Sequence, residues 1–348
     1  MCGFGGYFGA VRDGRVLLER MTAAIAHRGP DEQGLFTAKD AGLGHARLSI
    51  VGLGDGQQPM SDATGELTIA FNGEIFNYVE LREQLRAKGH RFRTSSDTEV
   101  ILHLYDEMGE DCLSVLNGDF AFALWDGRRR RMVLARDRMG VRPLFYTRQG
   151  DRFYFGSEVK ALLQVPGVNA EIDPVALDQI FTLWAPIAPR TAFRDIFELE
   201  PAHLMIVQEG SVSTRPYWSL DYPDRDAPSR RRDERAAAEE LRALLTEATR
   251  IRMRADVPVG SYLSGGLDSS ITSALAAGMA PGGLRTFSVT FDSTEHDESA
   301  FQMEMARALG TQHSSVACGE GDIAAVFPDV IRFTERPILR TAPAPLFK

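Results

Sequence analysis

Met1-Cys2-Gly3 opens the chain and places a thiol next to the N-terminus. A small second residue permits removal of the initiator methionine, after which Cys2 carries both a thiol and a free α-amine. The intrinsic pKa values of these groups are roughly 8.5 and 7.7–8.0, so the amine can serve as general base for the thiol near neutral pH. Taken alone, this stretch permits an N-terminal nucleophile but favours an incidental early cysteine, and the segments that follow reverse that preference.

Further segments supply the groups that an amidase for an amino-acid substrate requires. They are His27-Arg28-Gly29-Pro30-Asp31, Arg47-Leu48-Ser49-Ile50-Val51, Asn72-Gly73-Glu74-Ile75 and Ser96-Asp97. Arg47 can hold a carboxylate in bidentate fashion, and Glu74 and Asp97 can hold an α-ammonium group. The Asn72 side chain and the Gly73 N–H can face a developing oxyanion. Simpler alternatives are a turn at Gly29-Pro30, a surface cation at Arg47, a hairpin at Asn72-Gly73 and a helix N-cap at Asp97.

In combination, these segments resemble the class II glutamine amidotransferases, a branch of the N-terminal-nucleophile hydrolases, and more narrowly the glutamine-hydrolysing asparagine synthetases. The resemblance covers essentially the whole chain and extends to Asp119–Asp126, Ala135–Gly140 and Gly156–Leu162. It implies a four-layer αββα glutaminase domain over residues 2–220, with Cys2 as nucleophile and with Asn72 and Gly73 as the oxyanion hole. The glutamine ligands that it implies are Arg47, Leu48, Ser49, Ile50, Val51, Asn72, Gly73, Glu74 and Asp97.

Short apolar strands and amphipathic helices make up the first 220 residues. Strands are expected at Leu67–Asn72, Phe120–Trp125, Met132–Ala135 and Arg152–Phe155, and helices at Tyr78–Lys88 and Thr98–Met108. This mixture indicates layered sheets flanked by helices. The next segment, Asp221–Arg235, is charged and contains Pro223 and Pro228, which predicts an exposed linker.

Strand–helix alternation distinguishes the second half, residues 236–348. Helices are expected at about Ala236–Arg252, Ser270–Met279 and Glu298–Leu309, and strands at Pro258–Leu263 and Thr286–Phe291. This order indicates a parallel α/β sheet. The resemblance implies that this half is the N-terminal part of an asparagine synthetase ATP-binding domain.

A glycine-rich loop, Leu263-Ser264-Gly265-Gly266-Leu267-Asp268-Ser269-Ser270, joins the first of these strands to a helix. Consecutive glycines let backbone N–H groups approach phosphate oxygens, and a helix that begins after Ser269 favours an anion. The serines offer hydroxyl groups, and Asp268 is a candidate Mg²⁺ ligand. The loop lacks the lysine of a Walker A loop. A tight strand–helix connection without a ligand is the alternative.

The same loop resembles the pyrophosphate-binding loop of ATP pyrophosphatases, which cleave ATP between the α- and β-phosphates and form an acyl-adenylate. The resemblance implies ATP and Mg²⁺ as cofactors, with Asp268 as the metal ligand. The ATP site that it implies consists of Leu263, Ser264, Gly265, Gly266, Asp268, Ser269, Ser270 and Val289. Leu263 and Val289 would contact the nucleoside, although both are also ordinary core-strand residues. Adenylation suits amide synthesis, because a carboxylate becomes a good electrophile once AMP is attached.

Composition restricts the remaining partners. The net charge of −9 argues against nucleic acid, and the basic run Arg128–Arg131 follows Asp126-Gly127 as a hairpin turn would. The presence of only three cysteines favours a reducing, cytoplasmic setting, with Cys112 and Cys318 as packing residues. No secretory signal or membrane-length apolar run is visible, so no membrane partner is expected. A homodimer is left open.

Three functions follow from these patterns. The leading hypothesis is a glutamine-dependent asparagine synthetase that converts glutamine, aspartate and ATP to asparagine, glutamate, AMP and pyrophosphate. The second is an amidotransferase that acts on another carboxylate acceptor. For this hypothesis, Cys2 argues against β-lactam-forming relatives and lasso-peptide cyclases, which typically lack the nucleophile. The third is a paralogue that binds glutamine or ATP without synthesis.

One motif of the resembled family is missing from the sequence. The Ser-Gly-Glu-Gly loop of the synthetase site does not occur before the last residue, Lys348. We therefore expect a second domain that is incomplete. On the same ground, we expect a chain that hydrolyses glutamine without making asparagine by itself.

Overall fold

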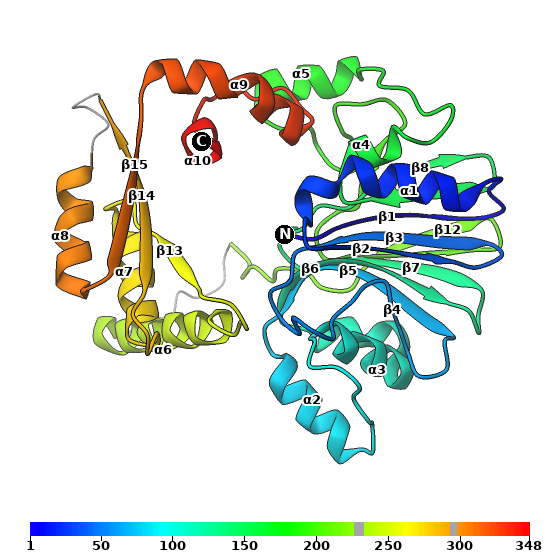
Figure 1. Cartoon of the computed structure of the whole chain (residues 1–348), viewed down its shortest axis with the longest axis horizontal. Helices are drawn as coiled ribbons and strands as arrows, with labels where there is room; N and C mark the ends of the chain where they lie inside the picture. The colour runs from blue at the N-terminus through cyan, green and yellow to red at the C-terminus, as the bar shows by residue number, and fades with distance from the viewer. Residues whose placement is uncertain (226–232, 293–297) are drawn as a thin grey trace. The chain divides into compact units, whose positions relative to one another are not determined.

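The computed structural model describes residues 1–225, 233–292 and 298–348 (Figure 1). These residues form two compact units. Unit 1 contains Met1–Leu220 with Glu335–Pro337, and unit 2 contains Asp221–Thr334 with Ile338–Lys348. Residues 226–232 of the predicted linker lie outside the described residues.

Two antiparallel six-stranded sheets form the centre of unit 1. The first has the order β10-β8-β9-β1-β3-β2 and the second has the order β12-β11-β7-β6-β5-β4. The strands of the first sheet are β1 (Gly3–Phe8), β2 (Glu32–Thr37), β3 (Ala41–Arg47), β8 (Phe145–Gln149), β9 (Arg152–Gly156) and β10 (Phe197–Glu198). Those of the second are β4 (Met60–Ser61), β5 (Leu67–Ile75), β6 (Gly118–Asp126), β7 (Arg131–Arg136), β11 (His203–Gln208) and β12 (Ser211–Pro216).

Helices cover the outer faces of the two sheets, which gives the predicted αββα order of layers (Figure 1). The helices on the first sheet are α1 (Gly14–Ala24) and α4 (Val159–Leu162), and those on the second are α2 (Tyr78–Ala87) and α3 (Thr98–Met108). Unit 1 also contains α5 (Pro174–Leu183) and the short 3-10 helices η1 (Ala26–Arg28) and η2 (Gly109–Ser114). Burial of apolar side chains in each of the three interfaces stabilises the sandwich.

The strands and helices predicted for this unit all form, and β5 continues further than expected. Residues 73–75 extend it because each pairs with β6, as Gly73 does with Phe120. Asn72 and Gly73 therefore lie inside a strand, and the alternative of a hairpin at this dipeptide is wrong. Cys112 is buried against the second sheet, as expected for a packing residue.

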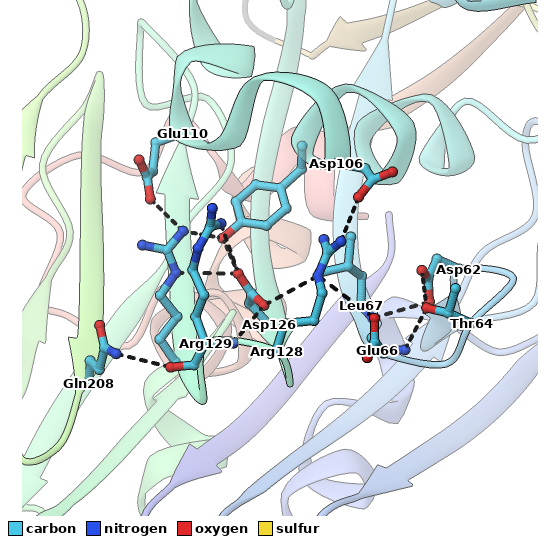
Figure 2. Close-up of polar contacts among 12 residues, drawn as sticks. Asp62, Thr64, Glu66, Leu67, Asp106, Glu110, Asp126, Arg128, Arg129 and Gln208 are labelled. Atoms are coloured by element: carbon cyan, nitrogen blue, oxygen red, sulfur yellow. Dashed lines mark hydrogen bonds and ion pairs between the residues drawn. The ribbon is translucent and has the colours of Figure 1, made fainter. Parts of the chain in front are cut away.

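The basic run Arg128–Arg131 lies at the turn between β6 and β7, as predicted. Figure 2 shows Arg128 paired with Asp106 of α3 and Arg129 paired with Asp126, at 2.7 and 3.3 Å. Asp126 is fully buried and also accepts a hydrogen bond from the Tyr105 hydroxyl at 3.0 Å. These ion pairs join the turn to α3, so the run contributes to the fold of the sandwich.

Unit 2 contains a parallel sheet with the order β13-β14-β15. Its strands are β13 (Gly260–Tyr262), β14 (Arg285–Phe291) and β15 (Gln312–Cys318). Its helices are α6 (Glu234–Arg252), α7 (Leu267–Ala277), α8 (Ser299–Leu309), α9 (Glu320–Thr334) and α10 (Ala344–Phe347). The sandwich followed by a parallel sheet is the fold class that the sequence predicts. Across both units, none of the described helices has the length and apolarity to cross a membrane.

Helix α7 begins earlier than the sequence predicts. The Ser270 N–H already donates to the Gly266 carbonyl at 3.1 Å, which makes Leu267 the first helical residue. Asp268 and Ser269 therefore lie in the first turn of α7 and not in the loop that precedes it.

Candidate active site

A pocket in unit 1 brings together most of the predicted glutaminase residues. Its lining consists of Met1, Cys2, Arg47, Leu48, Ile50, Val51, Gly56, Gln58, Phe71, Asn72, Gly73, Glu74, Ser96, Asp97, Thr98 and Arg142. Of the predicted set, Ser49 is not part of the lining, and its N–H donates to Asp31 Oδ2 at 2.8 Å. The other predicted residues reach the pocket from the start of β1, the end of β3, the middle of β5 and the start of α3.

The Cys2 thiol lies at one side of this pocket, held by the backbone of Leu48. The Leu48 N–H donates to Cys2 Sγ at 3.3 Å, and Sγ lies 3.4 Å from the Leu48 carbonyl oxygen. Burial raises the pKa of the Cys2 thiol, and the Leu48 N–H opposes that rise. The thiol is therefore protonated near neutral pH and needs a base to become a nucleophile.

Arg28 fixes the backbone of Cys2, a role that the sequence did not reveal. Its Nε donates to the Cys2 carbonyl oxygen at 2.8 Å, and its Nη1 donates to Glu158 Oε1 at 2.7 Å. Gly29, next in the chain, lies so close to β3 that a Cβ there would be 2.1 Å from the Ala46 carbonyl carbon. Close packing of this segment against β3 thus brings Arg28 to the nucleophile.

Every second residue of β5 points its N–H group away from β6. These groups lie on the opposite edge of β5, beyond the short stretch that pairs with β4. The Phe71 N–H donates to Gln58 Oε1 at 2.7 Å, and the Ile75 N–H donates to Asp97 Oδ2 at 2.8 Å. Gly73 lies midway between them, so its N–H points to the same edge, which lines the pocket. A Cβ at Gly73 would lie 2.1 Å from the Asp119 carbonyl oxygen, so the strand pairing requires glycine.

Asn72 presents a buried amide that is not satisfied by the protein. Its side chain is 1% exposed, and neither Oδ1 nor Nδ2 has a hydrogen-bond partner among the described residues. Leaving such a group unpaired costs about 1–3 kcal/mol, so a polar ligand in the pocket is expected to bind it. The amide and the neighbouring Gly73 line the same pocket, and each can donate a hydrogen bond there.

Charged groups of both signs line the same pocket. Arg47 is buried, and its Nη2 donates to the Gly52 carbonyl at 2.6 Å while its Nη1 donates to Glu32 Oε2 at 3.0 Å. Burial raises the pKa of Asp97 to about 6, and the charge of Glu74 adds to the rise. Asp97 stands at the N-cap position of α3, but its side chain makes no capping hydrogen bond there. The pocket thus offers arginine side chains for a carboxylate and carboxyl groups for an ammonium, which are the two charges of a free amino acid.

A second pocket lies in unit 2, beside the glycine-rich loop. Leu263, Ser264 and Val289 of the predicted ATP set line it, together with residues of α8 to α10. The other predicted residues, Gly265, Gly266, Asp268, Ser269 and Ser270, belong to the loop and the first turn of α7 and do not line this pocket. Within the loop, Ser264 Oγ and Ser269 Oγ lie 3.0 Å apart.

Among its described residues, unit 2 offers few side chains that could bind a metal ion together. No group of three or more His, Cys, Asp or Glu side chains suited to a metal occurs in the parts of the chain that the structure describes. Asp268 is a single carboxylate at the start of α7. Because Mg²⁺ prefers six oxygen ligands, an ion here would take most of them from phosphates and water. Asp268 fits Mg²⁺ only in that arrangement.

Comparison with known proteins identifies the class to which the chain belongs. Residues 1–218 match the family model for the glutamine amidotransferase domain, and residues 240–348 match the model for asparagine synthase. The chain belongs to the class II glutamine amidotransferase family, with an asparagine synthase segment after the amidotransferase domain.

Individual relatives agree with this assignment. The chain is 38% identical over 339 residues to glutamine-hydrolyzing asparagine synthetase 3 of Bacillus subtilis, with 92% of this chain and 54% of that protein covered. It is 34% identical over 340 residues to amidase chry2 of Gibberella zeae, with 92% and 50% covered. The chain thus spans about half the length of these curated relatives. A solved glutamine phosphoribosylpyrophosphate amidotransferase from B. subtilis is 19% identical with a TM-score of 0.48, covering 91% of this chain and 81% of that one.

Proposed function

We propose that this chain releases ammonia from glutamine at Cys2, and that its second domain uses ATP to activate a carboxylate that ammonia converts to an amide. We assign glutamine hydrolysis to residues 2–220, a linker to 221–235 and ATP binding to 236–348. The observation that carries the proposal is the pocket in which the Cys2 thiol and the unpartnered amide of Asn72 share one lining.

The proposed chemistry begins with loss of Met1, because the nitrogen of Cys2 is otherwise a peptide nitrogen and cannot accept a proton. The free α-amine then takes the proton from Sγ, and the thiolate attacks the side-chain carbonyl carbon of glutamine. Asn72 Nδ2 and the Gly73 N–H donate to the resulting oxyanion. The amine protonates the leaving nitrogen, ammonia departs, and a γ-glutamyl thioester remains on Cys2. Water hydrolyses the thioester to glutamate and restores the thiol.

The charges of the pocket provide specificity for an amino acid. In this proposal Arg47 binds the α-carboxylate, while Glu74 and Asp97 bind the α-ammonium group. Leu48, Ile50 and Val51 line the pocket together with Arg47, and Leu48 contacts Sγ directly. Binding both α-groups fixes the distance from the backbone of the substrate to the nucleophile. That distance favours the side-chain length of glutamine.

In the second domain, we propose that Leu263 and Val289 contact the nucleoside of ATP. We place the phosphates against Ser264, Gly265, Gly266, Ser269 and Ser270, and Mg²⁺ on Asp268. When bound, Mg²⁺ would neutralise phosphate charge during adenylation. Aspartate is the proposed acceptor, which would make the product asparagine. A different carboxylate is the second candidate, favoured by the similarity to a protein named as an amidase.

Assays of the purified chain test these steps separately. Glutamate release should require glutamine alone, and Asn72→Ala should lower kcat by about 10²- to 10³-fold with little change in KM. Asn169→Ala, an exposed residue of the same unit, should leave both constants unchanged. Pyrophosphate release from ATP with aspartate would support asparagine formation and overturn the expectation that this chain does not make asparagine by itself, whereas release only with other carboxylates would favour the second candidate. Absence of glutamate release from the wild-type chain would contradict the proposal.

A further inference from the structure

The peptide groups on both sides of Phe71 in β5 are held by side chains from outside that strand. His45 Nε2 lies 2.9 Å from the Phe71 carbonyl oxygen, and Gln58 Oε1 accepts the Phe71 N–H at 2.7 Å. His45 belongs to β3 of the first sheet, so its hydrogen bond crosses the sandwich to the second sheet. His45 is fully buried and Gln58 is 9% exposed.

The hydrogen bond to Phe71 determines the tautomer of His45. A carbonyl oxygen only accepts, so Nε2 must carry the hydrogen and donate it. Nδ1 has no partner among the described residues, which leaves it as the unprotonated nitrogen of a neutral ring. Burial lowers the pKa of His45 to about 4, in agreement with a neutral ring near pH 7. His45 is thus a donor with a fixed direction.

Strand pairing on this edge of β5 ends before the site. Pairing of β4 with β5 stops at Met60 and Ile69, two residues before Phe71. In the part of the chain that the structure describes, no strand pairs with this edge beyond that point, where Asn72 and Gly73 follow. β6 pairs with the opposite edge of β5 over its whole length, so it is the edge without a ladder that depends on side-chain contacts. An oxyanion hole needs its donors at about 2.7–3.1 Å from the oxygen.

We propose that His45 and Gln58 are positioning residues that hold β5 so that Asn72 Nδ2 and the Gly73 N–H converge on the oxyanion. The proposal rests on the proposed glutaminase function. Neither residue touches the reacting atoms in this account, and both act through the backbone of Phe71. The hydrogen bond from Ile75 to Asp97 secures β5 on the other side of Gly73.

Substitutions that keep side-chain volume but remove the contact test this role. His45→Leu removes the donor and Gln58→Met removes the acceptor, while His45→Gln retains an amide N–H that can donate to Phe71. Thr147→Val is the matched control, because it deletes a partly buried hydrogen bond of 2.7 Å from a buried side chain to the Asp195 carbonyl, outside the lining of the Cys2 pocket. We expect kcat for glutamine to fall on the order of ten- to hundred-fold in His45→Leu and Gln58→Met. KM should stay within about two-fold, His45→Gln should recover most of the loss, and Thr147→Val should behave as wild type.

Two inhibitors distinguish loss of oxyanion-hole geometry from a general loss of structure in the pocket. The γ-semialdehyde of glutamate can form a hemithioacetal with Cys2 whose oxygen requires the oxyanion hole, whereas glutamate requires only the amino-acid ligands. We expect the variants to bind the aldehyde more weakly by about the factor lost in kcat, with unchanged affinity for glutamate.

Two results would overturn the positioning role: unchanged kcat in both variants, or equal weakening of aldehyde and glutamate. If His45→Leu does not fold, Gln58→Met still tests the other contact to the Phe71 backbone, the one to its N–H. Failure of the glutaminase proposal itself is distinct, because it would appear in the wild-type chain and in Asn72→Ala.

Discussion

Asp97 Oδ2 accepts a hydrogen bond from the Ile75 N–H at 2.8 Å, which ties the residue before α3 to the strand that carries Asn72 and Gly73. The same carboxyl group is the proposed ligand of the substrate α-ammonium. Binding of an amino acid at Asp97 would therefore reach the oxyanion donors through a single hydrogen bond and two residues of β5. In the proposed function, recognition of the amino acid and stabilisation of the oxyanion would therefore share one short segment of backbone.

The first prediction concerns pH. Because burial raises the pKa of Asp97 to about 6, this carboxyl group is neutral below that pH and attracts an ammonium group less. We expect kcat/KM for glutamine to fall as the pH decreases through about 6, in a profile measured from about pH 4.5 to 8. Asp97→Asn should lower kcat/KM throughout and remove this acidic limb. An identical limb in the variant would assign it to another group.

Arg47→Lys should raise the KM for glutamine by about ten-fold or more, with a smaller loss in kcat. A planar guanidinium holds a carboxylate at two points, which an ammonium group cannot copy. The substitution also removes donors to the Gly52 carbonyl and to Glu32, so the loop after β3 loses its attachment. Steady-state kinetics measure both constants, and an unchanged KM would remove Arg47 from the substrate site.

Stability of unit 1 should decrease as the pH falls from 6.5 toward 4. The pKa of His45 is about 4 in the folded chain against 6.5 for a free histidine, so only the unfolded chain takes up this proton in that window. At about 1.4 kcal/mol per pKa unit, the loss approaches roughly 3 kcal/mol below pH 4.

Urea unfolding followed by tryptophan fluorescence measures this loss for unit 1. All three tryptophans, Trp125, Trp184 and Trp218, lie in that unit. His45→Gln carries no titrating group at this position and should lose less stability over the same pH range. Parallel pH dependences of the two chains would contradict the account of His45.

The spacing of apolar residues predicted helices and strands correctly where the buried residues repeat with the period of a helix or a strand. Helix α3 begins and ends where the sequence predicts, because Ile101, Leu104 and Tyr105 repeat at helical spacing and are buried on one face. β5 was predicted too short, since Gly73 and Glu74 favour a break in isolation. Pairing with β6 over its whole length overrides that preference.

The residues of the candidate site also fall into those that local sequence predicted and those that depend on long-range contacts. Cys2, Arg47, Asn72 and Asp97 were chosen by chemical type and by order along the chain, and all of them line one pocket. His45 and Gln58 were missed, and Arg28 was part of a chosen segment without an assigned role, because each acts on the backbone of a remote segment. The contact from His45 to Phe71 spans 26 residues, and no local pattern encodes it. Hydrogen bonds from a side chain to the backbone of a remote segment cannot be predicted from a single sequence.

The central claim is a covalent intermediate on Cys2, and mass spectrometry of the N-terminal peptide tests it directly. The purified chain is mixed with glutamine, quenched in acid during turnover and digested. We predict a peptide that lacks Met1 and carries a γ-glutamyl group on Cys2, together with loss of glutamate release in Cys2→Ala and in a chain that retains Met1. Turnover of glutamine by Cys2→Ala, or by the chain with Met1 still attached, would contradict the N-terminal-nucleophile mechanism.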